Sequence, residues 1–307
     1  MTAKNDSKID WQLKIIEDPE EFKQVEKLQG LVWTSSEIDI VPAHLMIASV
    51  RNGGMVIGAY KDPANQTNES LIGFVFGFPG IEYDGSIRKL KFCSHEMGVH
   101  PDFRGMGIGF ALKKAQRQLA RSMGYEKITW TYDPLLSVNA NLNIHRLGAV
   151  CHTYVRNYYG VMRDGLNKNS LSDRFQVDWW LNSKRVNNRI SEAPRQQLGF
   201  EQYHSSGCAI VSSSGMQVDE TREQQTDELK RIIQTQRIFL LEIPCDYRKV
   251  TLENPEIAYR WRIFTRNCFE LIFEAGFIVT DFVFAKENTT NKPKKCYYVM
   301  THEKETL

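Results

Sequence analysis

The chain has 307 residues, of which 42% are hydrophobic and 25% charged, the balance of an ordinary globular protein. Lys and Arg number 39 against 37 Asp and Glu, and this formal net charge of +2 gives no reason to expect binding to nucleic acid or to a membrane. No apolar run approaches the roughly 18 residues that a membrane-spanning helix needs. We therefore expect a cytoplasmic protein, long enough for about two domains of roughly 150 residues each.

The six cysteines are scattered along the chain and include no Cys-x-x-Cys pair. In a chain of this length we expect buried free thiols rather than a disulfide framework. Cys151 and His152 are adjacent rather than spaced as metal ligands are, and no second group of Cys or His completes a site. We expect no metal.

The first hundred residues predict a strand, two helices and an antiparallel meander. Acidic residues after Pro19 mark a helix start, and Pro42 opens a second helix. A polar loop, 61–69, separates two of the meander strands. The predicted strands are 11–16, 55–60, 71–78 and 89–99, and the helices are 19–32 and 42–50.

A strand–helix–strand pattern follows, which indicates an α/β fold with a mixed sheet. From Ile108 the apolar residues recur at helical spacing through Leu112, Ala115 and Leu119, with Lys113 and Arg117 among the residues on other faces. Gly124 is well placed to end this helix. The later predictions are strands 127–132, 149–154 and 173–181 and a short helix, 137–147, closed by Gly148.

Composition changes at about Asn182, and this change sets the expected domain boundaries. We predict a first domain at 1–182, a partly irregular linker or insertion at 183–236 with one hairpin around 209–211, and a smaller C-terminal α/β extension at 237–307. The extension has a β-α-β-β pattern: strand 238–243, loop 246–253, long helix 255–275, and strands 277–284 and 296–301. The sequence shows no short-period repeat.

The stretch from Met97 to Gly109 is the most informative in the chain. It predicts a strand end, a tight glycine-rich turn and the first turn of a helix, because Pro101 cannot continue a β-ladder. Such a turn directs several backbone N–H groups at one point, supported by the helix dipole, as phosphate-binding sites do. The spacing matches neither a dinucleotide fingerprint nor a P-loop.

The pattern Val99-x-Pro101-x-x-Arg104-Gly105-x-Gly107-Ile108-Gly109 resembles the pyrophosphate loop of the GNAT acyl-coenzyme A transferases. The resemblance implies a GNAT-like fold and acetyl-CoA or another acyl-CoA as co-substrate. It implies that backbone amides of 104–109 hold the diphosphate and that the strand 97–99 holds the pantetheine. The expected coenzyme contacts are Met97, Gly98, Val99, Arg104, Gly105, Met106, Gly107, Ile108, Gly109, Asn139 and Asn143.

Further stretches, including Trp130–Leu135, Leu147–Ala149 and Trp261–Arg266, resemble a branch of predicted GNAT proteins with a C-terminal extension. This resemblance covers about Trp11 to Met300. Members near the branch are linked to N-acylation of amino acids, including N-succinylation. It therefore implies an amino acid as acceptor.

Glu96 and His95 are the candidate general bases, because both precede the glycine loop on its strand. Strand alternation predicts that they lie on opposite faces unless a bulge intervenes. We favour Glu96. The family's usual acid is a tyrosine four residues before the glycine that ends the short helix, and here that position is Ile144, so the acid step moves to another group such as Tyr154, or the thiolate leaves unaided.

Several polar residues remain with two interpretations each. Asp133 could bind an acceptor ammonium or serve the turn before Pro134. Arg174 could pair with a carboxylate, either that of the acceptor or that of a succinyl group. Arg104 could contact phosphate or cap the loop. Arg262 and Arg266 lie one helical turn apart, and we expect a solvated face there.

The predicted function is CoA-dependent transfer of an acetyl or succinyl group to the amine of a small molecule. The alternatives are a protein N-acetyltransferase and a non-catalytic acyl-CoA-binding or regulatory module. We expect neither nucleic acid nor membrane as partner, and the sequence leaves a homodimer open.

Overall fold

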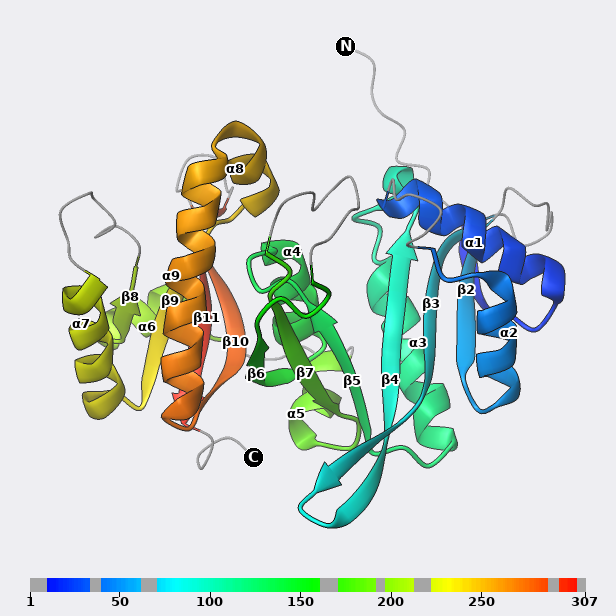
Figure 1. Cartoon of the computed structure of the whole chain (residues 1–307), viewed down its shortest axis with the longest axis horizontal. Coiled ribbons are helices and arrows are strands. Elements are labelled where there is room, and N and C mark those ends of the chain that lie inside the picture. The colour runs from blue at the N-terminus through cyan, green and yellow to red at the C-terminus, as the bar shows by residue number, and fades with distance from the viewer. Residues whose placement is uncertain are drawn as a thin grey trace. The chain divides into compact units, whose positions relative to one another are not determined.

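Figure 1 shows a computed structural model of the chain, which describes residues 10–33, 40–61, 71–160, 171–191, 197–212, 222–286 and 293–302. The expected polar loop after Lys61 lies outside these ranges. The described residues divide into two compact units, with the boundary after Thr129. No helix among them combines the length and the apolar character needed to cross a membrane.

The first unit contains the predicted strand, two helices and antiparallel meander. Its strands follow the order β1-β2-β3-β4, and β4 pairs in parallel with the start of β5. The strands are β1 (Trp11–Ile15), β2 (Met55–Lys61), β3 (Leu71–Asp84), β4 (Ile87–Val99) and β5 (Lys127–Tyr132). The helices are α1 (Pro19–Trp33), α2 (Ala43–Arg51), the 3-10 turn η2 (Pro101–Phe103) and α3 (Ile108–Ser122).

The helices of this unit cover two faces of its strands. Phe74 and Phe76 of β3 pack into a core with residues of α1 and α2. Gly73, one residue earlier, faces α3, because a Cβ built on it would lie 3.0 Å from Ile108 and 3.4 Å from Leu112. Neighbouring residues of a strand point to opposite faces, so α3 packs on the face away from α1 and α2. The absence of a side chain at Gly73 lets α3 approach closely.

In the second unit the strands follow the order β5-β7-β6-β10-β11-β9-β8, beginning with the end of β5. Its strands are β6 (Val150–Val155), β7 (Arg174–Trp180), β8 (Ala209–Val211), β9 (Ile238–Ile243), β10 (Phe277–Lys286) and β11 (Pro293–His302). Its helices are α4 (Ser137–Ala140), the π-helical turn η3 (Asn141–Arg146), α5 (Lys184–Ile190), α6 (Phe200–Ser205), α7 (Arg222–Thr235), α8 (Tyr247–Glu253) and α9 (Pro255–Glu274).

Three expectations about the C-terminal residues are corrected. The predicted loop 246–253 contains helix α8, which Asp246 caps by accepting a hydrogen bond from the Lys249 N–H at 3.0 Å. Residues 209–211 form no hairpin, because β8 pairs in parallel with β9. Cys245 and Cys296 form a disulfide instead of free thiols, since strand pairing of β9 with β11 brings them to a Cα–Cα distance of 5.4 Å.

The segment 183–236, expected to be partly irregular, contains α5, α6, β8 and α7.

Candidate functional site

The glycine loop between β4 and α3 has the backbone geometry of an anion site. Gly105 and Gly107 both have φ of +83°, which L side chains rarely adopt, and a Cβ at either position would meet no atom within 4 Å. Helix α3 begins directly afterwards at Ile108. The first N–H groups of a helix have no acceptor within it, so those of α3 are available to an anion at this end.

Arg104 fixes the base of this loop. Its Nε donates to the Val99 carbonyl at 3.3 Å and its Nη2 to the Val32 carbonyl near the end of α1 at 3.1 Å. The His100 N–H donates to the Ile72 carbonyl at 2.9 Å, which continues the pairing with β3 to the edge of the loop. Of the two interpretations of Arg104, these contacts favour the loop cap.

Gly98 brings the strand close to α1. A Cβ at this position would lie 2.9 Å from the Phe74 ring and 3.1 Å from Val32. A larger residue would therefore displace the strand that leads into the loop, and packing explains this glycine.

A β-bulge in β4 sets the positions of the two candidate bases. Phe76 pairs with Glu96 and Gly77 with Ser94, so His95 is the extra residue on β4. This bulge is the exception to strand alternation that the sequence analysis allowed for, and it brings His95 Nε2 to within 3.9 Å of Glu96 Oε1. The His95 ring also packs against the rings of Phe76 and Phe78, at centroid distances of 5.8 and 5.6 Å.

The environment of Glu96 suits a general base. Glu96 Oε2 is buried and has no hydrogen-bond partner among the described residues. Burial raises the pKa of this carboxyl to about 7 and lowers the pKa of His95. A carboxyl with a pKa near 7 is half ionised at neutral pH and accepts a proton more readily than an exposed one.

A lysine that the sequence analysis assigned to another face lies behind the bulge. Lys113 of α3 is only 2% exposed, and its Nζ donates to Ser94 Oγ at 2.7 Å and to Gln116 Oε1 at 3.2 Å. Burial lowers the pKa of Lys113 to about 7. Arg117, which the sequence analysis also placed on another face of the helix, is buried as well. The buried stripe of α3 contains the predicted Ile108 and Leu112. It then continues through positions 113, 116, 117 and 120, whereas the predicted Ala115 and Leu119 are only half-buried.

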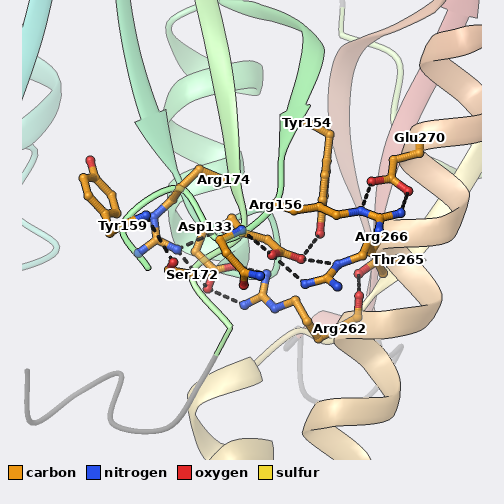
Figure 2. Close-up of polar contacts among 12 residues, drawn as sticks. Asp133, Tyr154, Arg156, Tyr159, Ser172, Arg174, Arg262, Thr265, Arg266 and Glu270 are labelled. Carbon is orange, nitrogen blue, oxygen red and sulfur yellow. Dashed lines mark hydrogen bonds and ion pairs between the residues drawn. The ribbon is translucent and has the colours of Figure 1, made fainter. Parts of the chain in front are cut away.

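The second unit contains a buried ion-pair network at the end of β5 (Figure 2). Both carboxylate oxygens of Asp133 accept from Arg262 of α9, at 2.9 and 2.5 Å. Arg174 Nη1 lies 4.0 Å from the same carboxylate, and its guanidinium stacks over the Tyr159 ring at 5.3 Å. Asp133 is thus paired within the protein, whereas Arg174 makes a looser contact with it.

A second ion pair, similar to that of Arg262 with Asp133, links α9 to the residue before β7. Arg266 donates to both oxygens of Asp173, at 2.8 and 2.7 Å, and the Tyr154 hydroxyl donates to Asp173 Oδ2 at 2.6 Å. Burial and the hydrogen bond to Asp173 raise the pKa of Tyr154. The expected solvated face at Arg262 and Arg266 is wrong: Arg262 is 1% exposed, because both guanidiniums reach carboxylates at strand ends.

The remaining predicted residues lie as follows. Met97 and Val99 are half-buried on β4, Met106 is exposed at the loop, and Gly109 lies in the first turn of α3. Asn139 is half-buried in α4 and Asn143 is buried in η3. Ile144, in the position of the family's usual tyrosine, is fully buried. The structure therefore brings the loop, Glu96 and His95 together in the first unit, and Asp133, Tyr154 and Arg174 in the second. Within the described ranges, no group of three or more His, Cys, Asp or Glu could hold a metal ion.

Comparison with known proteins gives the family of the first part of the chain. Residues 16–148 match the model of the acetyltransferase (GNAT) family. This segment, which includes the glycine loop and the bulged strand, is a GNAT acetyltransferase domain, and enzymes of this kind depend on acyl-CoA. No curated protein matches the sequence significantly.

Several solved structures are similar to part of the chain. NAA60 of Arabidopsis thaliana in complex with acetyl-CoA is 15% identical, with 57% of this chain and 100% of that chain covered at a TM-score of 0.46. The putative acetyltransferase yncA of Salmonella typhimurium with acetyl-CoA is 16% identical, with 61% and 99% covered at 0.43. An aminoglycoside acetyltransferase from an uncultured soil metagenomic sample is 17% identical, with 40% and 78% covered at 0.34.

Proposed function

We propose that this protein transfers an acetyl or succinyl group from acyl-CoA to the amine of an amino acid. The observation that carries the proposal is that one strand and the loop after it combine a half-buried carboxylate, Glu96, with an anion-binding turn. Glu96 lies three residues before Val99, where β4 ends, and the loop leads directly into α3. The GNAT family match covers both features.

In the proposed reaction the backbone amides of 104–109 hold the diphosphate of the coenzyme, and β4 lies along the pantetheine. Glu96 removes a proton from the acceptor ammonium, directly or through water. The freed amine attacks the thioester carbonyl, and a backbone N–H of β4 stabilises the negative charge that develops on the carbonyl oxygen. The C–S bond then breaks, the electron pair leaves on the coenzyme sulfur, and the nitrogen loses its second proton to water to give the neutral amide.

The leaving thiolate needs no tyrosine in this proposal. The Tyr154 hydroxyl already donates to Asp173, and its raised pKa makes it a poorer proton donor than an unperturbed tyrosine. A thiol has an ordinary pKa of about 8.5, so a thiolate is a good leaving group at neutral pH. We therefore propose that Tyr154 is a structural residue and that the thiolate takes its proton from solvent.

Arg174 is our proposed contact for the acceptor carboxylate. A guanidinium can bind a carboxylate in a bidentate manner, and this general property of arginine is the basis of the proposed contact. The choice of an amino acid as acceptor depends otherwise on the resemblance of the chain to its GNAT branch.

Free-thiol release with acetyl-CoA or succinyl-CoA and a panel of amino acids tests the proposal. We expect release that depends on one acceptor and falls by about 10²-fold or more in Glu96→Gln, the usual contribution of a general base. Glu17→Gln, which alters an exposed carboxylate of the same unit, is the matched control. Release unaffected by Glu96→Gln would assign the base to His95 or water, and CoA binding without any acceptor-dependent release would refute transfer to amino acids.

A further inference from the structure

Two sets of strands in the second unit have the same topology. The first set runs β5, α4–η3, β6, β7, and its order in the sheet is β5-β7-β6. The second set runs β9, α8–α9, β10, β11, and its order is β9-β11-β10. In both, the strand that comes last in sequence lies between the other two, and it is antiparallel to the strand before it. Figure 1 shows β6 and β10 next to one another, with α9 in front of the second set.

The elements that precede each set also correspond. In the first unit, β4 pairs in parallel with the start of β5, and helix α3 connects them. In the second unit, β8 pairs in parallel with β9, and helix α7 connects them. We call β4 to β7 the first copy and β8 to β11 the second copy.

The two copies meet at equivalent residues. Gly148 ends the helical segment of the first copy with φ of +76°, and Gly276 follows α9 with φ of +80°. Cys151 and Val279 are each the third residue after their glycine, and they are the pair through which β6 and β10 join in antiparallel orientation. A strand pair between equivalent residues of two copies is the pairing that a two-fold axis produces.

Contacts across this junction are reciprocal. Helix α9 of the second copy contacts β6, and η3 of the first copy contacts β10. Each crossing has a polar side-chain contact: Arg156, after β6, donates to both oxygens of Glu270 at 2.5 Å, and His145 Nδ1 lies 2.9 Å from Asp281 Oδ1. The two helical segments therefore each pack against the strand of the other copy.

The second copy lacks the sequence of the diphosphate loop. Residues 212–221, between β8 and α7, contain a single glycine, Gly215, and no Arg-x-x-Gly-x-Gly pattern. They include Asp219 and Glu220, whose negative charges disfavour a diphosphate. The part of the first copy that makes the anion site has thus no counterpart in the sequence of the second.

We infer that the described residues between 209 and 302 are a second copy of the β4-to-β7 half of the acyltransferase fold, without a coenzyme site. This second copy serves as an internal partner that covers the β6 edge of the first copy. An uncovered β6 would present a row of unpaired N–H and C=O groups, which proteins usually pair or protect. The inference depends on the proposed function only in taking the glycine loop of the first copy as the coenzyme site.

Calorimetric titration of the full chain with CoA tests the missing site. We expect one CoA per chain, at least tenfold weaker binding in Gly107→Val, and unchanged binding in the matched variant Gly215→Val. Two CoA per chain, or equal weakening by the two variants, would overturn the inference. If the unaltered chain binds no CoA, the proposed function is contradicted, and the hydrogen-exchange measurement described next decides the inference by itself.

Backbone hydrogen exchange of the unaltered chain tests the internal partner without any ligand. We expect the amides of β6 to exchange at least tenfold more slowly than those of β8, which is the outermost strand at its end of the described sheet. Exchange of β6 as fast as that of β8 would show that β10 does not cover it and would overturn the inference.

Discussion

Replacing Glu96 with Gln should stabilise the protein, and the gain should depend on pH. Burial raises the pKa of Glu96 from 4.5 to about 7. The folded protein therefore binds this proton more tightly than the unfolded chain does. Stability from the protonated carboxyl is fully present below pH 4.5 and is lost as the pH rises through 7. Glutamine keeps the shape of the protonated carboxyl and does not titrate.

The size of the effect follows from the shift. Each pKa unit corresponds to about 1.4 kcal/mol, so a shift of roughly two and a half units costs the folded state about 3 kcal/mol once Glu96 is ionised. Between pH 5 and pH 8.5 the free energy of unfolding of Glu96→Gln, relative to the unaltered protein, should therefore increase by about 2 to 3 kcal/mol. Acyl transfer should be lost together with this gain in stability, because the ionised carboxylate that destabilises the folded protein is the group that serves as base.

Urea unfolding of both proteins at these two pH values measures the difference. Glu17→Gln controls for the loss of a carboxylate, since Glu17 is exposed, and should show no such change. His95→Gln in both backgrounds separates the contribution of the imidazole, whose Nε2 lies 3.9 Å from Glu96. A difference that stays constant from pH 5 to pH 8.5 would mean that Glu96 is well solvated, and would refute our account of its raised pKa.

Three further predictions concern other parts of the structure. Gly107→Val should weaken CoA binding at least tenfold in a direct titration, because Gly107 has a φ of +83° that valine adopts only with strain. Burial lowers the pKa of Lys113 to about 7, so the unfolded chain binds this proton more tightly and the free energy of unfolding should rise between pH 7 and about 10. Lys113→Met should remove this rise. Unfolding curves over this pH range test the prediction, and an unchanged rise in the variant would contradict it. Arg262→Met should lower the free energy of unfolding by about 3 to 5 kcal/mol in urea, because it leaves the buried Asp133 carboxylate without its bidentate partner. Asp133→Asn in that background should restore part of the loss. If it restores nothing, lost packing accounts for the effect.

The sequence predicted most of the elements because the signals involved are local. Helix starts at Pro19 and Pro255, the period change at Ile108 and the helix-ending glycines were all legible within a few residues. The glycine loop was legible for the same reason, since φ above zero and a helix N-terminus both follow from residue types at short spacing. Helix α8 was missed because its cap, Asp246, stands in a polar stretch that also suits a loop.

The sequence by itself determined the fold class, the glycine loop and its neighbouring carboxylate, and with them the family of the first part of the chain. Only the tertiary structure decided that His95 and Glu96 share one side of β4, since a bulge depends on the register of the partner strand. Only the tertiary structure placed Arg262 and Arg266 against carboxylates more than 90 residues away in sequence. The duplication of the half-fold was equally invisible, because strand order and the β6–β10 junction are set by long-range pairing that leaves no short-period repeat in the residues themselves.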